Sequence, residues 1–454
     1  MELPNYFFAD LGAEEALSEQ LVWDAALTLK RNGQTYLRQR STASIIRTLA
    51  QIGELWCDPE YEFRKLVLEK GPKETGFSKE IIELGLNTFF EQLTQENLEA
   101  LVSQEMGHMK RLDAMSISKE ERFSERAAMA VGPDLLVHIT AGNLPASALS
   151  SIVLGFLIRS PQFVKCAKGT SFIPRMFAHS IYFEDSKLGS SLEVAEWQGG
   201  NTTFEKPLFQ EARLVTAMGS DETLKAIHDR LPQHVRFIGY GHRTSFAFVA
   251  RESLEGFLAK ETLQNTAHDI CAWDQSGCLS PQVIYVERDG LVNPSEFASR
   301  LAKEMDAFQQ GHPRGAITTE EAALISSTRA MYEMRSADAP EATQIWASES
   351  STNWTVVYEA DPIWQSNPTS RFVYVKAVDS IDEMLRNLEP QRYNLSTVGV
   401  AAPEERLEDF VTTFAQWGIT RICPIGRMQK PPITWRHDGR PPLAEWVTWV
   451  DWEQ

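Results

Sequence analysis

Cys278 is the residue in this sequence best placed to do covalent chemistry. It stands in the run WDQSGCLSPQVIYV, residues 273–286, between small side chains and directly ahead of an alternating apolar segment that predicts a strand. Small neighbours leave a sulfur accessible and let backbone N–H groups surround whatever is bonded to it. A buried, unreactive cysteine is the ordinary alternative. The pattern therefore predicts Cys278 on a turn, as a nucleophile able to carry an acyl group.

A second polar turn lies in HITAGNLP, residues 138–145. The apolar run before it predicts a strand, and Pro145 removes a backbone donor and fixes the chain. Asn143 is then free to direct its side-chain amide toward a pocket, where it would serve as an oxyanion donor. An asparagine that only forms the turn explains the same pattern.

Two further segments suit the binding of phosphate groups. Lys165 and Lys168 follow the end of a predicted parallel strand, which is the edge where open α/β sheets bind ligands. Gly219 and Ser220 stand between a predicted strand and a predicted helix, where free N–H groups and the helix dipole favour an anion. Solvated lysines and an ordinary helix N-cap are the alternative readings.

The elements that must position these residues change character along the chain. Residues 11–125 show apolar residues at three- and four-residue spacing, which predicts helices. From about residue 131, short apolar runs such as LLVHI, QFVKCA and VRFIGY alternate with helical segments, which predicts β-α-β units and a parallel sheet. A second α/β segment runs to about residue 410. The remaining residues, 411–454, are rich in tryptophan, and we expect them to pack on the body or on another subunit.

The composition limits the classes of partner. The formal charge of −18 argues against nucleic acid and anionic membranes as general partners. The five cysteines form no C-x-x-C pair and no zinc-like cluster with histidine, so we expect no metal site and a reducing, cytoplasmic setting. The N-terminus lacks the pattern of a secretory signal, and the apolar runs are shorter than the ~18 residues of a membrane span.

Taken in order, these segments resemble the aldehyde dehydrogenase superfamily, and more closely its long-chain fatty acyl reductases of the LuxC type, which supply aldehyde to bacterial luciferase. The motifs that carry the resemblance are HITAGNLP (138–145), FVKCAKGTS (163–171), the Gly219-Ser220 turn, WDQSGCLSPQVIYVE (273–287), GITRICPIG (418–426) and WRHDG (435–439).

The resemblance implies an α/β fold with a Rossmann-type cofactor domain, an α/β catalytic domain and a helical N-terminal lead-in. We expect a helical region at 1–125 packed on the cofactor domain, an NADP-binding domain at 126–262, a catalytic domain with the nucleophilic cysteine at 263–410, and a C-terminal segment at 411–454 that contributes to oligomer contacts.

The resemblance also implies roles for the candidate residues. Cys278 is the nucleophile, and Asn143 binds the oxyanion together with the Cys278 backbone N–H. Lys165 contacts the adenosine ribose or its phosphate, and Gly219 and Ser220 face the pyrophosphate.

Two departures from hydrolytic relatives point to a reductase that uses NADPH. The stretch Ile238–Ser245, where those relatives carry a glutamate base, contains no carboxylate. Lys168 stands where NAD-preferring relatives often carry a glutamate, and a cation there would attract a 2′-phosphate.

The sequence therefore predicts reduction of a fatty acyl thioester to the aldehyde, with acyl-CoA or an acylated synthetase-type partner protein as donor and a homo-oligomer as the assembly. An aldehyde dehydrogenase that works in the oxidative direction and a cysteine acyltransferase are the alternatives. His268 and the His437-Asp438 pair are further candidates, for which a structural role is the alternative.

Overall fold

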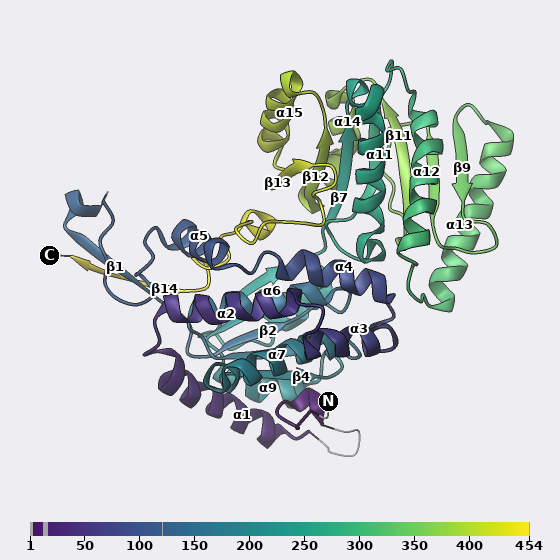
Figure 1. Ribbon diagram of the computed structural model, residues 1–454. Helices are drawn as coiled ribbons and strands as arrows, with labels where there is room; N and C mark the ends of the chain where they lie inside the picture. Colours follow the sequence, from purple (N-terminus) through teal and green to yellow (C-terminus); the bar gives the residue numbers. More distant parts are fainter. Residues whose placement is uncertain (1–2, 12–16, 120, 454) are drawn as a thin grey trace. The chain divides into compact units, whose positions relative to one another are not determined.

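The computed structural model describes residues 3–11, 17–119 and 121–453, and the chain divides into two compact units (Figure 1). The first unit falls within residues 1–75, 86–241 and 432–454, and the second within residues 76–85 and 242–431. The division therefore falls at 241/242 and 431/432, whereas the sequence suggested boundaries at 262/263 and 410/411.

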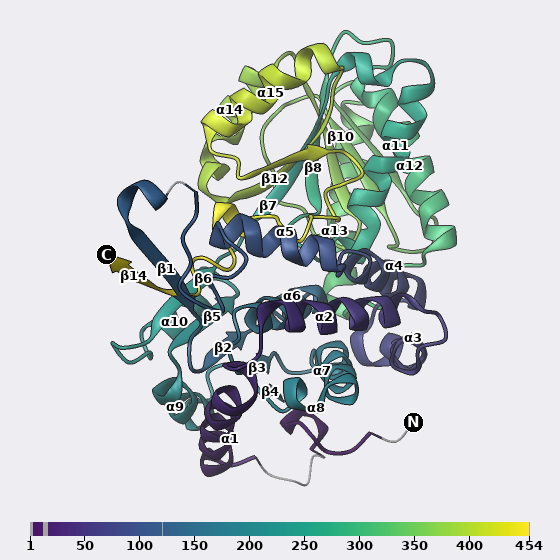
Figure 2. The ribbon, with the colours of Figure 1, turned by 60° about the vertical axis from the view of Figure 1, so that its left-hand side comes forward.

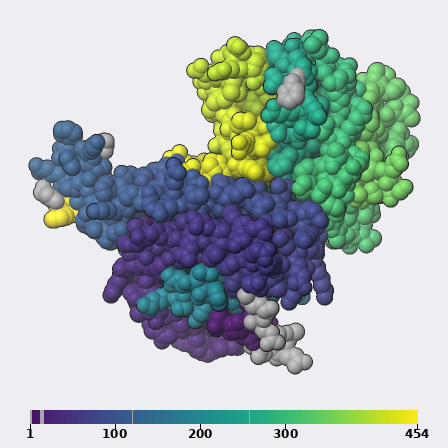
Figure 3. Space-filling model, viewed as in Figure 1, coloured from purple at the N-terminus to yellow at the C-terminus, as the bar shows by residue number. Residues whose placement is uncertain are grey.

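The N-terminal region is helical, as predicted. Its side chains, purple to blue in Figure 3, form most of the visible face of the first unit. Serine and threonine side chains begin several of these helices; the Ser41 hydroxyl, for example, accepts a hydrogen bond from the N–H of Ser44 at 3.2 Å. The helices are α1 (Glu19–Asn32), α2 (Thr42–Cys57), α3 (Glu62–Thr75), α4 (Lys79–Phe90) and α5 (Gln95–Met106).

The first unit is built on a parallel sheet with the strand order β4-β3-β2-β5-β6. Its strands are β2 (Leu136–Ile139), β3 (Gln162–Cys166), β4 (Leu192–Glu196), β5 (Leu214–Met218) and β6 (Arg236–Tyr240). The chain winds outward from β2 in one direction and then returns to add β5 and β6 on the other side. Doubly wound sheets bind ligands at such a switch point, beyond the carboxyl ends of the strands.

Helices cover both faces of this sheet (Figure 2). One face carries α6 and α7, with α2 packed beyond them. The other carries α1, α9 and α10, whose apolar residues bury against Val137, Phe163 and Val215 of the strands. The connecting helices are α6 (Pro145–Leu157), α7 (Phe172–Glu184), α8 (Ser186–Gly189), α9 (Thr202–Glu211) and α10 (Asp221–His228).

The second unit is built on a larger sheet with the order β13-β12-β7-β8-β11-β10-β9, in which β9 alone of the described strands runs antiparallel to its neighbour. The strands are β7 (Thr244–Val249), β8 (Pro281–Glu287), β9 (Thr343–Ala347), β10 (Thr355–Glu359), β11 (Phe372–Val378), β12 (Leu395–Ala401) and β13 (Arg421–Pro424). The strand predicted directly after Cys278 is confirmed as β8.

Helices also sandwich the second sheet. Apolar residues of α11 and α12 bury against one face, and those of α13, α14 and α15 against the other. These helices are α11 (Gly256–Cys271), α12 (Pro294–Gly311), α13 (Thr319–Asp338), α14 (Ile381–Leu388) and α15 (Glu404–Trp417). The α/β fold predicted from the sequence is therefore confirmed.

The C-terminal residues return to the first unit. Trp446 is buried, 5.4 Å from the His138 ring between centroids, and β14 (Thr448–Glu453) pairs antiparallel with β1 (Arg126–Val131). Among the helices of the described residues, none combines the length and the apolar character that crossing a membrane requires.

Candidate active site

Asn143, Gly219 and Ser220 lie at one edge of the first sheet. Asn143 is exposed on the turn between β2 and α6, and Gly219 and Ser220 connect β5 to α10. The strands β2 and β5 are parallel neighbours, so both turns lie beyond the same carboxyl ends. The Ser220 hydroxyl accepts a hydrogen bond from the N–H of Thr223 at 3.3 Å and caps α10. The structure therefore places these three residues at the switch point of the sheet.

Lys165 lies one residue before the end of β3, on the other side of β2, and only 4% of its surface is exposed. Burial lowers the pKa of its ammonium group, and the nearby carboxylates, chiefly Glu205, oppose this shift. A buried ammonium ion at the carboxyl end of a strand is available to an anionic ligand at that edge.

Lys168 is exposed on the turn after β3. The next residue, Gly169, has a φ of +82°, a left-handed backbone conformation that favours glycine. The Glu196 carboxylate, at the end of β4, accepts hydrogen bonds from the N–H groups of Gly169 at 2.7 Å and Ser171 at 3.1 Å. Glu196 was not predicted from the sequence, because β4 was not among the predicted strands. A carboxylate thus shares this turn with the cation of Lys168.

Cys278 lies on a turn between α11 and β8 and is half-buried, as the sequence predicted. The carbonyl oxygen of Cys278 accepts a hydrogen bond from the hydroxyl of Ser245 on β7 at 2.6 Å. The same hydroxyl oxygen accepts from the N–H of Thr397 on β12 at 3.2 Å. Two neighbouring strands therefore fix the backbone of the cysteine.

The segment that leads into the cysteine turn, residues 273–275, has a left-handed backbone conformation with positive φ angles. Trp273, Asp274 and Gln275 have φ values of 52°, 52° and 63°, and residues 369–371, directly ahead of β11, have φ values of 59°, 54° and 64°. None of these residues is glycine, so each costs conformational free energy of order 1–3 kcal/mol that surrounding contacts must offset.

A buried ion pair joins the two left-handed runs. The fully buried Arg371 guanidinium contacts the Asp274 carboxylate at 2.7 and 3.0 Å, and the other Asp274 oxygen accepts from the N–H of Gly315 at 2.9 Å. Burial raises the pKa of Asp274, and Arg371 opposes that rise. The Gln275 amide adds bonds to the Phe372 backbone, accepting from its N–H at 2.8 Å and donating to its oxygen at 2.9 Å.

Residues 76–85 of the N-terminal region belong to the second unit and pack against Trp273, in the segment that leads into the cysteine turn. Gly85 of α4 packs so closely on Trp273 that an added Cβ would lie 1.8 Å from the indole ring. The Phe77 ring contacts the same indole edge-on at 5.2 Å, and the Gly76 carbonyl accepts from the N–H of Ala316 at 2.8 Å. Residues 76–85 therefore pack on the cysteine-bearing unit, whereas we expected all of 1–125 on the cofactor domain.

The other side of the cysteine turn is held by the segment after β13. The Gln429 amide donates to the Ser280 hydroxyl at 3.0 Å and to the Asp269 carbonyl at 3.1 Å. The Asp269 carboxylate accepts from the N–H of Gly426 at 2.5 Å. Gly426, the last residue of the GITRICPIG motif, therefore contacts α11, and Gln429, three residues beyond the motif, contacts the end of the cysteine turn.

The pKa values of the remaining cysteine thiols are all raised. Burial raises the pKa of Cys166 and Cys271 to about 12 and that of Cys423 to about 11. Cys57 is exposed, and its pKa is raised chiefly by partial burial. Within the described parts of the chain, no group of His, Cys, Asp and Glu is arranged to hold a metal ion.

The two histidine candidates have structural contacts. His268 lies on α11 with its Nδ1 3.6 Å from the Asp269 carboxylate and its ring against Phe308. His437 stacks on the Tyr240 ring in the first unit, at 4.7 Å between centroids. We therefore assign neither imidazole to the chemistry.

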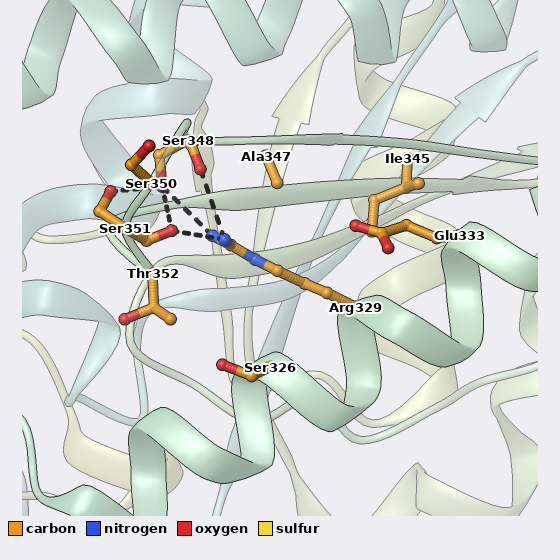
Figure 4. A pocket seen from close by; sticks show the side chains of 9 residues that line it. All are labelled: Ser326, Arg329, Glu333, Ile345, Ala347, Ser348, Ser350, Ser351 and Thr352. Atoms are coloured by element: carbon orange, nitrogen blue, oxygen red, sulfur yellow. Dashed lines mark hydrogen bonds between the residues drawn. The ribbon is translucent and has the colours of Figure 1, made fainter.

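A cavity of about 590 Å³ lies elsewhere in the second unit, between α13 and the β9–β10 connection (Figure 4). The Arg329 side chain points into its wall, toward Ser348 and Ser351. Its N–H groups donate to oxygens of Ser348, Ser351, Trp354 and Thr355. Its donors are thus occupied in fixing the loop, and the cavity contains none of the predicted site residues.

Comparison with known proteins agrees with this fold. A NAD-dependent benzaldehyde dehydrogenase from Corynebacterium glutamicum is similar with a TM-score of 0.70 and 13% identity, over 99% of this chain and 94% of that one. A bifunctional proline utilization A protein is similar with a TM-score of 0.71 and 14% identity, and this chain spans 45% of its length. The protein therefore has the aldehyde dehydrogenase fold.

The comparison with protein families is more specific than the comparison of folds. The model of the acyl-CoA reductase (LuxC) family matches residues 37–449, so the chain belongs to that family. A relative named long-chain acyl-protein thioester reductase, from Vibrio harveyi, is 25% identical over 424 residues, which cover 92% of this chain and 84% of the relative.

The supporting residues were missed in the sequence. Ser245 on β7 contacts the Cys278 carbonyl, and Arg371, directly ahead of β11, contacts Asp274 in the segment before the turn. No spacing rule along the sequence links either residue to Cys278. A weak signal was available in Asp274 and Gln275, two polar residues within the cysteine motif that follow the apolar residues Ala272 and Trp273.

We predict that Arg371→Met lowers the free energy of unfolding by about 3–5 kcal/mol, because it leaves the Asp274 carboxylate buried without its cation. Urea denaturation followed by circular dichroism measures the change. The matched control is Arg300→Met, which removes an ion pair with Glu296 whose side chains are each 43% exposed, and it should cost about 0.5 kcal/mol or less. Equal losses in the two variants would contradict the role given to the buried pair.

Proposed function

We propose that this protein reduces a fatty acyl thioester to the aldehyde through an acyl group bonded to Cys278. The observation that carries the proposal is a half-buried cysteine on a rigid turn, in a chain of the acyl-CoA reductase (LuxC) family. The name of the Vibrio harveyi relative, a long-chain acyl-protein thioester reductase, supports the same substrate class.

Acyl transfer to the protein is the first step. The Cys278 thiolate forms a bond to the acyl carbon, and the carbon–sulfur bond of the donor breaks, so the donor leaves as a thiolate with the electron pair. The fixed turn supports this step because its backbone is held from β7 and β12 and loses no further freedom when the acyl group arrives.

Reduction of the bound acyl group is the second step. A reduced nicotinamide, when bound, supplies the hydride to the acyl carbon. Asn143 and the Cys278 N–H then stabilise the resulting alkoxide, each by roughly 2.7–4 kcal/mol. When the alkoxide collapses, the bond to Cys278 breaks, the aldehyde is released and the thiolate is restored.

The first unit has features that suit the binding of a dinucleotide. Its strand order provides a switch point, Gly219 leaves the start of α10 open, and the buried Lys165 offers a cation at the same edge. Lys165 would contact the adenosine ribose or its phosphate, while Gly219 and Ser220 would face the pyrophosphate.

Reduction to the aldehyde is favoured because the segment that carries the glutamate base in hydrolytic relatives has no carboxylate here. Residues Ile238–Ser245 contain no carboxylate. Without a base to activate water, an acyl-cysteine is not hydrolysed efficiently, which favours release of the aldehyde over oxidation to an acid. The donor is acyl-CoA or an acyl thioester on a synthetase-type partner.

Replacing the cysteine tests the function. With acyl-CoA and NADPH, the wild-type protein should consume NADPH, followed at 340 nm, and produce an aldehyde that can be trapped. Cys278→Ala should lose both this activity and labelling by a radioactive acyl donor, since the acyl carrier is gone. Persistent labelling of this variant would remove the assignment, and Cys423→Ala is the matched control that should keep both activities.

Asn143→Ala separates the two steps in the same assay. It should still accept the acyl label but reduce it about 10²–10³-fold more slowly, because the alkoxide loses one donor.

We further propose that NADPH is preferred and that Lys168 attracts its 2′-phosphate. Lys168→Glu should lower the ratio of kcat/KM for NADPH over NADH by roughly tenfold or more, since the phosphate then meets a second carboxylate beside Glu196. Lys187→Glu makes the same charge change on α8, ahead of β4 and thus at the opposite end of the strands, and should leave the ratio unchanged. An unaltered ratio in Lys168→Glu would contradict the proposal.

We also propose that the protein forms a homo-oligomer through exposed apolar surface. On α13, Leu324, Met331 and Met334 expose 52%, 47% and 75% of their surface on one side of the helix. Met334→Glu should shift sedimentation velocity toward the monomer, whereas Gln310→Glu on α12 should not. A wild-type protein that already sediments as a monomer would contradict this proposal.

A further inference from the structure

We propose that a cavity in the first unit binds phosphate, either as the free ion or as the phosphate group of a monoester. The cavity has a volume of about 180 Å³, and Lys30, Arg38 and Arg159 line it together with Asp113 and Asp134. A water molecule takes about 30 Å³ of the liquid, so this volume accommodates a tetrahedral anion. The proposal goes beyond the proposed reduction and does not depend on it.

The cavity lies at the amino ends of strands of the first sheet. Its walls include residues 132–134, ahead of β2, and part of the connection from α6 to β3. Asn143 and Lys168, by contrast, follow the carboxyl ends of these two parallel strands. A ligand of the cavity is therefore separate from the dinucleotide proposed for the carboxyl edge.

Arg159 is held at the cavity by long contacts that leave part of its guanidinium available. Its side chain is 11% exposed. Its Nη1 lies 3.4 Å from the carbonyl oxygens of Arg38 and Arg40 and 3.5 Å from the Asp113 carboxylate, beyond the usual distance of about 2.7–3.2 Å. Within the described parts of the chain, no hydrogen bond uses its Nε or Nη2. The guanidinium thus keeps donors for an anion with several acceptor oxygens.

Arg38 brings a second guanidinium to the same cavity. Its side chain is exposed and forms no hydrogen bond or ion pair with the other described residues. Burial lowers the pKa of the Arg159 guanidinium, Asp113 opposes this shift, and the charge of Arg38 adds to it. The two arginines therefore repel each other, and an oxyanion that contacts both guanidinium groups relieves that repulsion.

The local backbone fixes the two arginines relative to each other. Arg38 directly follows a π-helical turn, Gly33–Leu37, and such turns are frequent at functional sites. Gly33 packs so closely on Pro161 that an added Cβ would lie 2.7 Å from the proline ring. Arg159 has a φ of 57°, a left-handed conformation that costs free energy and persists where surrounding contacts require it.

The other charged side chains at the cavity already have partners. The Asp113 carboxylate accepts hydrogen bonds from the N–H and the hydroxyl of Thr42, at 2.9 and 2.8 Å. The Lys30 ammonium lies 2.8 Å from the Glu211 carboxylate and 3.8 Å from that of Asp134. The carboxylates thus balance much of the positive charge, and the unused donors of the two arginines provide the specific contacts for phosphate.

Calorimetric titration of the full chain with inorganic phosphate, at an ionic strength held constant with chloride, tests the proposal. The wild-type protein should show saturable binding. Arg159→Gln and Arg38→Gln should each raise the Kd roughly tenfold or more, because each removes charge-assisted hydrogen bonds. Arg38 is exposed, so its variant keeps the test valid if circular dichroism shows that Arg159→Gln is unfolded. Absence of saturable binding to the wild type overturns the proposal.

Arg31→Gln is the matched control. It removes the same charge from an exposed residue of α1 that does not line the cavity, and it should leave the Kd unchanged. A Kd that rises equally in Arg31→Gln and Arg38→Gln reports only net charge, and a Kd that rises in neither arginine variant of the cavity places the phosphate elsewhere. Either result overturns the proposal.

Asp134→Asn changes the charge in the opposite direction. It removes a carboxylate from the cavity while Lys30 keeps its closer partner Glu211, so it should lower the Kd for phosphate by about two- to fivefold. A Kd that rises in this variant contradicts an anion site. Lys168→Glu, which alters the carboxyl edge, should leave phosphate binding at the cavity unchanged.

Competition identifies the source of the phosphate group. If phenyl phosphate displaces inorganic phosphate with a similar Kd, then the cavity accepts monoesters; if it does not, then free phosphate is the ligand. Both results support a phosphate site. The titrations contain no acyl donor and no nicotinamide, so their outcome is independent of whether Cys278 carries an acyl group.

Discussion

The turn that carries Cys278 depends on the buried ion pair between Asp274 and Arg371. Each partner ends or lies within a run of left-handed residues that are not glycine, and such backbone persists only where surrounding contacts over-determine it. The pair supplies that constraint because it joins residues 273–275, which lead into the cysteine turn, to the residues directly ahead of β11. Gly85 and Phe77 add packing against Trp273 from a segment far away in sequence. A turn held in this way presents its sulfur in one orientation, which a covalent acyl carrier requires.

The proposed functional residues of the two units lie at opposite ends of their strands. In the first unit, Asn143, Lys168 and Ser220 lie beyond the carboxyl ends of parallel strands, as expected for ligands of open α/β sheets. In the second unit, Cys278 precedes β8, and Ser245, Arg371 and Arg421 lie at the amino ends of β7, β11 and β13. The amino ends of β7 and β11 thus meet the cysteine turn and the segment before it. Ser245 holds the Cys278 carbonyl, and Arg371 holds Asp274, so the backbone around the cysteine is fixed from distant strands.

The charge near the candidate residues differs from the net charge of the chain. The chain as a whole is acidic, with a formal charge of −18. Two of its buried cations lie near the candidate residues: Lys165 at the edge of the first sheet, and Arg371 at the segment before the cysteine turn. Other buried cations of the described residues lie elsewhere: Arg64, Arg111, Arg329, Lys376 and Arg421. Away from solvent, where screening is weak, one such cation acts on its neighbour more strongly than many exposed charges do. The mean field of the surface therefore says little about the chemistry of either region.

Local patterns in the sequence were sufficient for the α/β fold class, for the helical N-terminal region, and for the turn positions of Cys278, Asn143, Gly219 and Ser220. Strand, helix and turn signals are local, and a cysteine flanked by small residues ahead of a strand needs no tertiary information to be placed on a turn. The sequence missed six strands: β1, β4, β9, β12, β13 and β14. Short or partly exposed strands such as β9, β13 and β14 carry weak patterns, whereas β12 is buried and was missed although it is seven residues long. Only the tertiary structure brought Ser245 to Cys278, Arg371 to Asp274 and residues 76–85 to the second unit. Contacts of that kind depend on strand order and on packing between distant segments, and neither leaves a periodic trace along the chain.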